Sequence, residues 1–152
     1  MNMWRKIFGT TALALMLCLT GLVMSGEAQA QRFVDNGNGT VTDTQTGLMW
    51  TKDANPMGPM DWYNAMVRCG SFSISGIGGW RLPSKNELLA LSDAMQGGHP
   101  FTGFGQLPYY YWSSTTDAND ADSAWSVDMS YGDNWTANKT DTLYVWPVRS
   151  GQ

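Results

Sequence analysis

The N-terminal apolar segment limits what this chain can fold into more than any other feature of its sequence. After two positive side chains, an uncharged apolar run of 18 residues extends from Ile7 to Met24, and small residues then lead to Ala30. This order of positive, apolar and small residues is typical of a secretory signal peptide. We therefore expect cleavage after Ala30 and a mature protein that begins at Gln31, in the periplasm or outside the cell.

Two other interpretations of the segment fit the residues less well. A membrane anchor needs at least about 17 apolar residues, so the run is near the lower limit. Gly9 and Gly21 interrupt it, and no positive stop signal follows. A lipid anchor on Cys18 requires a small residue where Leu17 stands. We expect a mature form without a membrane span.

Residues 31–152 have the length of one domain, and their composition restricts both its stabilisation and its partners. Cys69 is the single cysteine in this part of the sequence, so no intrachain disulfide can form. It falls on an apolar helical face, where we expect it to be buried. The seven basic and twelve acidic side chains give a net charge of −5, without a basic cluster. This balance argues against nucleic acid as a partner.

The first half of the domain contains turn signals between short strand and helix patterns. An Asn-Gly repeat predicts a hairpin between strands at 32–35 and 40–43, and a further turn leads into a strand at 48–50. Asp61 is placed to cap a helix that runs to about Cys69.

The second helix has the clearest start in the sequence. Ser84 and Glu87 stand at the spacing of a capping box, in which each side chain accepts a hydrogen bond from the backbone of the other residue. Leu88, Leu91 and Met95 then follow on one face.

In the C-terminal third, the sequence predicts strands at 109–114, 124–131 and 143–149. Apolar and polar residues alternate in the middle segment, which predicts a sheet with one solvated face. Pro147 lacks a backbone donor, so the last strand is expected at a sheet edge or at a bulge. Strands, two helices and strands again indicate an α+β domain.

Five short motifs resemble, in this order, the C-terminal domain family of the Legionella collagen-like adhesin, over roughly residues 33–149. They are DNGNGTVTD at 35–43, TGLMW at 46–50, WRLPSKNEL at 80–88, YWSST at 111–115 and WPVR at 146–149. The resemblance implies a C-type-lectin-like fold with two helices and long loops. It also implies distant similarity to formylglycine-generating enzymes and to the variable receptor-binding proteins of diversity-generating systems.

Members of this family are commonly exported, and the namesake uses the domain to attach to glycosaminoglycans. This chain departs from the namesake in two respects. No Gly-X-Y collagen repeat precedes the domain, and its negative charge repels sulfated glycans. The resemblance therefore carries over the fold and leaves the ligand open.

Few residues are available for catalysis or metal binding. A formylglycine-generating oxidase works through a cysteine pair, whereas this domain has Cys69 alone. His99 lies in a Gly/Pro-rich loop and is expected at the surface, away from a catalytic triad. One histidine and one cysteine are too few for a transition-metal site. We expect no catalytic residue, metal site or cofactor; a carboxylate pair of the glycosidase type is the alternative, although no spacing selects one.

Candidate binding residues fall in two polar segments. The first has four oxygen-bearing side chains in six residues, which are either calcium ligands or a solvated loop. The second interleaves aromatic side chains with Asp and Asn, as carbohydrate and protein contacts do. For its tryptophan, packing in the core is the alternative. The residues are Asp117, Asn119, Asp120 and Asp122 in the first segment, and Tyr131, Asp133, Asn134, Trp135 and Lys139 in the second.

These features favour an exported, non-catalytic binding or adhesion module that recognises a glycan or a protein through these loops. Two alternatives remain. One is a scaffold or assembly component of the cell envelope, which packs the same aromatic surface against a partner protein. The other is a thiol-dependent enzyme related to the formylglycine-generating oxidases.

Overall fold

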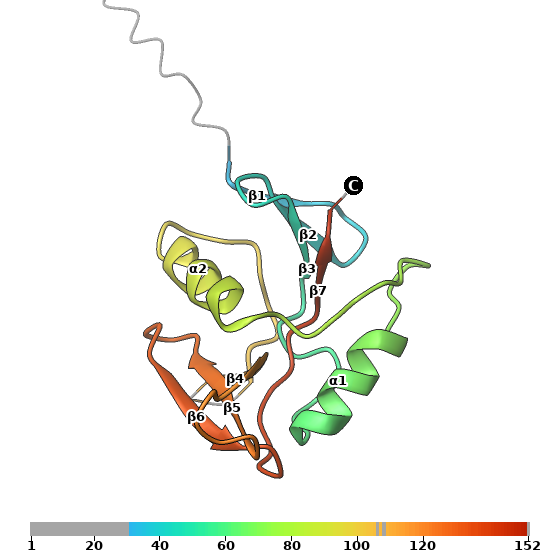
Figure 1. Cartoon of the computed structure of the whole chain (residues 1–152). Helices are drawn as coiled ribbons and strands as arrows, with labels where there is room; N and C mark the ends of the chain where they lie inside the picture. The colour runs from blue at the N-terminus through green and yellow to red at the C-terminus, as the bar shows by residue number, and fades with distance from the viewer. Residues whose placement is uncertain (1–30, 106, 108, 152) are drawn as a thin grey trace, which may run out of the picture.

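Two helices and two antiparallel sheets make up the part of the chain that the computed structural model describes, residues 31–105, 107 and 109–151 (Figure 1). The expected signal peptide at residues 1–30 lies outside this part. The elements are β1 (Phe33–Asp35), β2 (Thr40–Asp43), β3 (Leu48–Thr51), α1 (Trp62–Ser71), α2 (Lys85–Met95), β4 (Tyr110–Thr116), β5 (Ser123–Asp128), β6 (Asn134–Asn138) and β7 (Val148–Ser150). The strand orders are β1-β2-β3-β7 and β4-β5-β6. The α+β class is confirmed.

The N-terminal hairpin forms where the Asn-Gly repeat predicts it. Strands β1 and β2 pair antiparallel, with Phe33 opposite Asp43. Gly37 and Gly39 have φ angles of 72° and 84°, a region that side chains with a Cβ rarely adopt. The Asn36 amide nitrogen donates to the Thr40 hydroxyl at 2.9 Å and fixes the base of the turn.

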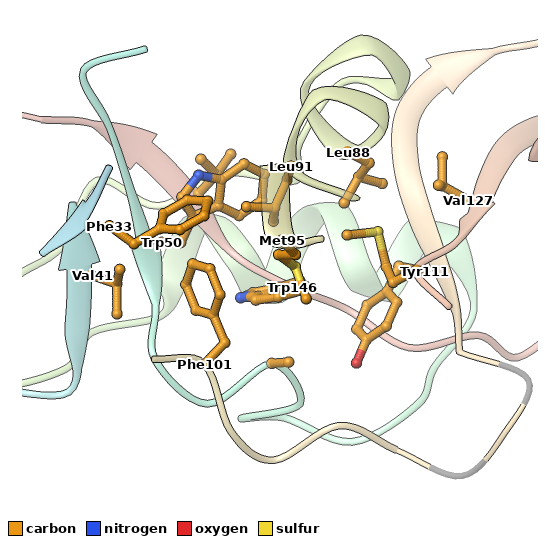
Figure 2. Close-up of a cluster of buried hydrophobic side chains, with 13 residues drawn as sticks. Phe33, Val41, Trp50, Leu88, Leu91, Met95, Phe101, Tyr111, Val127 and Trp146 are labelled. Atoms are coloured by element: carbon orange, nitrogen blue, oxygen red, sulfur yellow. The ribbon is translucent and has the colours of Figure 1, made fainter. Parts of the chain in front are cut away.

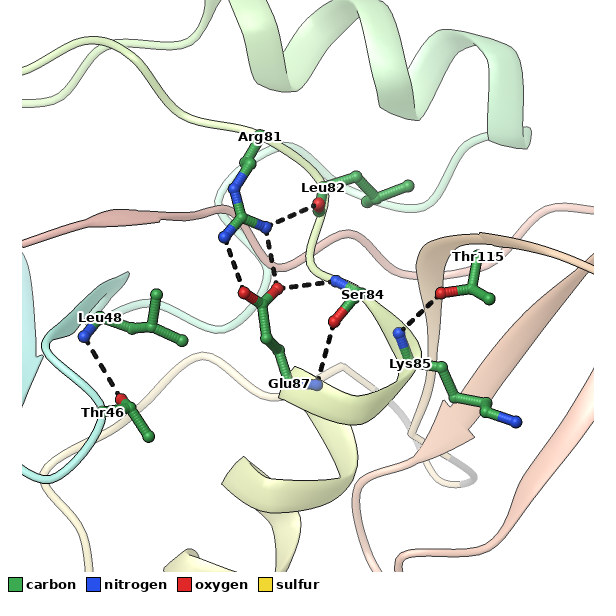
Figure 3. Close-up of polar contacts among 8 residues, drawn as sticks. All are labelled: Thr46, Leu48, Arg81, Leu82, Ser84, Lys85, Glu87 and Thr115. Atoms are coloured by element: carbon green, nitrogen blue, oxygen red, sulfur yellow. Dashed lines mark hydrogen bonds and ion pairs between the residues drawn. The ribbon is translucent and has the colours of Figure 1, made fainter.

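Both helices begin at the predicted residues. The Asp61 side chain accepts from the backbone N–H of Asn64 at the start of α1. At the start of α2, the Ser84 hydroxyl accepts from the Glu87 N–H, and the Glu87 carboxylate accepts from the Ser84 N–H (Figure 3). Local sequence is sufficient to place these ends because capping bonds join residues only three positions apart.

The predicted strand at 124–131 and its solvated face are wrong in part. Strand β5 ends at Asp128, and a turn follows. Ser126 and Asp128, expected on the solvated face, are 2% and 5% exposed. The Ser126 hydroxyl donates to the Trp135 carbonyl in β6, and the Asp128 carboxylate accepts from the Ser130 N–H in the following turn. Both buried polar side chains therefore have hydrogen-bond partners.

The predicted strand at 143–149 is divided into two parts. Residues 143 and 144 form isolated bridges, and the Tyr144 N–H and carbonyl bond to β4. The chain then crosses to the larger sheet, where β7 pairs with β3 as an edge strand. Pro147 precedes β7 directly, so the expectation of an edge position is confirmed.

Two clusters of buried side chains surround the smaller sheet. In the larger cluster, the Trp146 ring lies with its centroid 5.0–5.8 Å from the ring centroids of Trp50, Phe101 and Tyr111 (Figure 2). The ring of Phe104, which packs against the cluster, has its centroid 5.5 Å from that of Trp146. This cluster packs the larger sheet, α2 and one face of the smaller sheet together. The second cluster packs α1 against the other face. No helix in the part of the chain seen here is both long and apolar enough to cross a membrane.

Candidate binding site beside the β5–β6 turn

The 117–122 loop of the first predicted segment and the Tyr131 turn of the second lie at opposite ends of β5, whereas Lys139, which follows β6, returns to the first loop. The loop at 117–122 joins β4 to β5, and the turn at 129–133 joins β5 to β6. A strand of six residues is about 20 Å long at roughly 3.3 Å per residue. The 117–122 loop and the Tyr131 turn are therefore two separate surfaces, and they do not combine into one site.

The first segment is a loop whose carboxylates bond to their own backbone. Asp117 accepts from the Asn119 N–H at 3.0 Å, and Asp120 accepts from the Asp122 N–H at 3.0 Å and from the Ser123 hydroxyl at 2.7 Å. The bonds from Ser123 and Asp122 lower the pKa of Asp120. Two of the four oxygen-bearing side chains thus form turns, as in a solvated loop.

Lys139 has a structural role in this region. Its side chain is 7% exposed, and its ammonium donates to the Ala121 carbonyl at 2.7 Å. The same nitrogen lies 4.3 Å from the centroid of the Trp62 ring, within the range of a cation–π contact. Lys139 therefore joins the 117–122 loop to α1 and does not extend toward solvent.

The second segment contains a turn that holds Tyr131 in the open. The Asp128 carbonyl accepts from the N–H groups of Tyr131 and Gly132, and the Asp128 N–H donates to the Asp133 carbonyl at 2.8 Å. The buried Asp128 carboxylate accepts from the Ser130 N–H at 2.8 Å. Tyr131 itself is 81% exposed. A large apolar ring is thus presented to solvent on a turn that is fixed by four hydrogen bonds around one buried residue.

A groove of about 360 Å³ lies between this turn and α2. We call it the α2–turn groove. It is lined by Leu89, Ser92, Asp93 and Gln96 of α2 and by Ser130, Tyr131 and Gly132 of the turn. The Ser130 hydroxyl oxygen is buried and has no hydrogen-bond partner among the residues described. Gly132 has a φ of 76°, a backbone conformation that residues with a Cβ rarely adopt, so the turn requires glycine at this position.

The α2–turn groove combines an aromatic plate with hydroxyl, carboxylate and amide groups. Such a set suits a ligand with one apolar face and several hydroxyl groups. The helical contribution was missed at the sequence level, although a signal exists. Residues 89, 92, 93 and 96 stand at i, i+3, i+4 and i+7 and form a largely polar stripe beside the apolar face of α2.

Trp135 lies on the face of the smaller sheet opposite to the one that packs against α2. It stands opposite Ser126, which stands opposite Trp112, so the three side chains share the face that α1 covers. Trp135 is 55% exposed, and the alternative that it packs in the core beside Trp125 and Trp146 is wrong. Asn134 and Asp133 are also exposed.

The two residues considered for catalysis are placed as expected. Cys69 is fully buried, and burial raises the pKa of its thiol to about 12. His99 is exposed at the loop after α2, beside the rings of Phe101 and Phe104. Desolvation lowers the pKa of His99, so its imidazole is neutral at pH 7. No group of three or more His, Cys, Asp or Glu side chains able to hold a metal ion occurs in residues 31–151 as far as they are described.

No curated protein matches this chain. The sequence model of the Lcl C-terminal domain matches residues 39–149, in close agreement with the range of 33–149 inferred from the five motifs. The match covers more than half of the 152 residues. The chain therefore belongs to the Lcl C-terminal domain family.

Proposed function

We propose that this protein is an exported, non-catalytic binding module that recognises a neutral glycan through the α2–turn groove. The observation that carries the proposal is Tyr131, a residue that is 81% exposed on a hydrogen-bonded turn at the edge of a polar groove. Monosaccharide rings stack an apolar face on an aromatic side chain while their hydroxyl groups exchange hydrogen bonds with neighbouring polar groups. Asp93 and Gln96 are the exposed polar side chains of the groove that are placed for those bonds.

The charge of the groove supports a neutral ligand over a sulfated one. Asp93 is exposed within the groove, and no basic side chain lines it. The net charge of −5 in residues 31–152 adds a repulsive field for polyanions. The C-type-lectin-like fold is part of the same proposal, and two helices, two antiparallel sheets and long loops support it.

The thiol-dependent enzyme is the less favoured alternative. Its nucleophile in the mature domain would be Cys69, which packs between α1 and the smaller sheet. A buried thiol with a raised pKa is both inaccessible and protonated at neutral pH. Periplasmic or extracellular location remains part of the proposal and is supported by the leader-like residues 1–30.

One observation favours the scaffold function as a second candidate. The outer face of α1 exposes Tyr63, Met66 and Val67, which are 54%, 40% and 71% accessible. These residues stand at i, i+3 and i+4 and form one apolar stripe. A stable oligomer or a co-purifying envelope protein, lost in the variant Val67→Asp, would favour this function.

The proposed function is tested with a glycan array followed by calorimetry on the neutral oligosaccharides that bind. Tyr131→Ala is expected to abolish detectable binding, whereas Tyr131→Phe retains it because the ring provides most of the contact. Tyr63→Ala, which removes an exposed tyrosine from α1, is the matched control and retains affinity. Absence of glycan binding by the folded protein, or equal affinity in Tyr131→Ala, overturns the proposal.

A further inference from the structure

Strand β6 is an open edge of the smaller sheet (Figure 1). It pairs with β5 on one side only, and four of its five residues are exposed. An open edge presents backbone N–H and C=O groups, which are the groups that another strand binds. The question is which of these groups are free and what strand fits them.

The ladder between β5 and β6 fixes the direction of each backbone group. At one end the Asp128 N–H donates to the Asp133 carbonyl, and at the other end the Lys139 N–H donates to the Asp122 carbonyl, each at 2.8 Å. Hydrogen-bonded pairs alternate along an antiparallel ladder. Residues 134, 136 and 138 therefore direct their N–H and C=O groups away from β5.

A turn covers only the last of these three residues. The Asn138 N–H donates to the Asp141 carboxylate at 3.1 Å, and the Asn138 carbonyl accepts from the Asp141 N–H at 2.8 Å. Within the residues described, no other segment pairs with the outer side of Asn134 or Thr136. The open part of the edge thus consists of two N–H and two C=O groups.

The other sheet edges are covered or charged. Tyr144 bonds to the outer side of β4, and Arg81 bonds to the outer side of β7. Strand β1 contains Asp35, which forms an ion pair with Lys52. Charges on an edge strand oppose pairing with another chain, as do proline and bulges. Strand β6 has no charged residue, no proline and no shift of register against β5.

We propose that β6 pairs antiparallel with β6 of a second copy of this chain, with Trp135 opposite the partner's Trp135. In this register Asn134 stands opposite the partner's Thr136, so all the open N–H and C=O groups of both copies are paired. The two tryptophans form a pair without backbone bonds, the arrangement in which facing side chains are closest. The pair covers an aromatic residue that is 55% exposed in the single chain.

The sequence of β6 makes a second copy a suitable partner. Its residues are neutral, so twofold pairing brings no like charges together, and an aromatic cross-strand pair is favourable. The contact is small: two indoles of roughly 150–250 Å² each and two short edges bury less than the ~1,200 Å² of a stable interface. We therefore expect a weak, reversible dimer. It is independent of the proposed glycan binding by the α2–turn groove.

Cysteine cross-linking tests the register. A pair without backbone bonds has a Cα separation of about 4.5 Å, within the range of a disulfide. In a Cys69→Ala background, Trp135→Cys is expected to give a disulfide-linked dimer on mild oxidation. Ala137→Cys is the matched control on the same face, because the register separates its two copies by at least about 13 Å. Equal cross-linking of the two variants, or none in Trp135→Cys, overturns the proposal.

Sedimentation velocity at concentrations up to about 1 mM, the Kd range of a small interface, tests the edge itself. Thr136→Pro removes an outward N–H that the ladder with β5 does not use, and it is expected to weaken the dimer at least about tenfold. Thr136→Val retains the donor and the dimer. Val67→Asp, on the exposed face of α1, also retains it.

Circular dichroism checks that Thr136→Pro is folded, and its affinity for a neutral oligosaccharide is expected to be unchanged, so the dimer and the glycan function can fail separately. A monomer at every concentration overturns the proposed dimer and leaves β6 to an extended peptide of another protein. A dimer that Val67→Asp removes and Thr136→Pro retains overturns it in favour of α1.

Discussion

Arg32 and Asp43 form a two-point ion pair that attaches the first residues after the expected cleavage site to strand β2. The Arg32 Nε and Nη2 atoms each lie 2.9 Å from a carboxylate oxygen of Asp43. The Asp43 side chain is 2% exposed, whereas that of Arg32 is 25% exposed. The Gln45 N–H also donates to Asp43 at 3.0 Å, but Arg32 is the cation paired with this buried charge, and it reaches the carboxylate from the edge of the sheet.

The first prediction is that Arg32→Gln lowers the free energy of unfolding by about 2 kcal/mol, because it leaves the buried Asp43 carboxylate without its counter-ion. Urea unfolding followed by tryptophan fluorescence measures the change. Lys52→Gln is the control, since the Lys52–Asp35 pair is exposed on both sides and contributes less. Equal effects of the two variants would contradict the assignment.

The same ion pair, together with Arg81–Glu87, predicts a loss of stability in acid. Burial raises the pKa of Asp43 and Glu87, and it is the largest single effect on each. The hydrogen bonds from Arg32, Thr46 and Gln45 to Asp43, and from Arg81 and Ser84 to Glu87, together with the arginine charges, outweigh it, so the net pKa of both carboxyls is lowered. A carboxylate whose pKa is lower in the folded state stabilises the fold above the unfolded pKa of about 4. That contribution is lost as the pH falls through the folded pKa.

The measurement is the urea midpoint as a function of pH from neutral to acid. It is expected to be flat above about pH 7, to fall slightly below the unfolded His99 pKa of about 6.5 because the fold disfavours the charged imidazole, and to fall further below about pH 5 as the carboxylates are protonated. The variant Asp43→Asn is expected to be less stable at neutral pH but to lose less on acidification. A midpoint that falls as steeply in Asp43→Asn as in the native protein would exclude Asp43 as a source of the dependence.

How far the sequence predicts this fold depends on how local each interaction is. The Ser84–Glu87 capping box is fixed within one helical turn, and it was predicted to the residue. The burial of Ser126 and Asp128 was not, because it depends on contacts with β6 and the following turn. Strand alternation indicates which side chains share a face, whereas the cover on that face is a tertiary property.

The candidate site shows the same division. Tyr131 was identified as one of the aromatic residues that alternate with Asp and Asn in the second segment, and the structure finds it exposed. The α2 side of the groove was missed because Ser92 and Gln96 precede the Tyr131 turn by about 40 residues in the sequence. By themselves they have the pattern of an ordinary helix surface. Lys139 was grouped with the loop by proximity in sequence, although its side chain is buried.

A third prediction concerns Cys69, which fills space between α1 and the smaller sheet. We expect its thiol to remain unmodified by iodoacetamide in the native protein and to react in urea, since burial both shields it and raises its pKa to about 12. Cys69→Ser is expected to cost about 2 kcal/mol because it buries a hydroxyl, and Cys69→Ala is expected to cost less. Fast native labelling, checked by intact mass, would revive the thiol-dependent enzyme.

The last prediction separates the two exposed aromatic residues of the second polar segment. Tyr131 borders the α2–turn groove, whereas Trp135 lies on the face of the smaller sheet that α1 covers. If the groove binds the glycan, Tyr131→Ala weakens binding by at least about tenfold, as removal of a stacked ring does at a hot spot. Trp135→Ala leaves the affinity within about twofold, because a residue without contact to the ligand contributes little.

Calorimetry with one neutral oligosaccharide measures both variants, and near-ultraviolet circular dichroism checks that each is folded. Equal losses in the two variants would mean that the ligand contacts the edge of β6, and the groove would then not be the binding site.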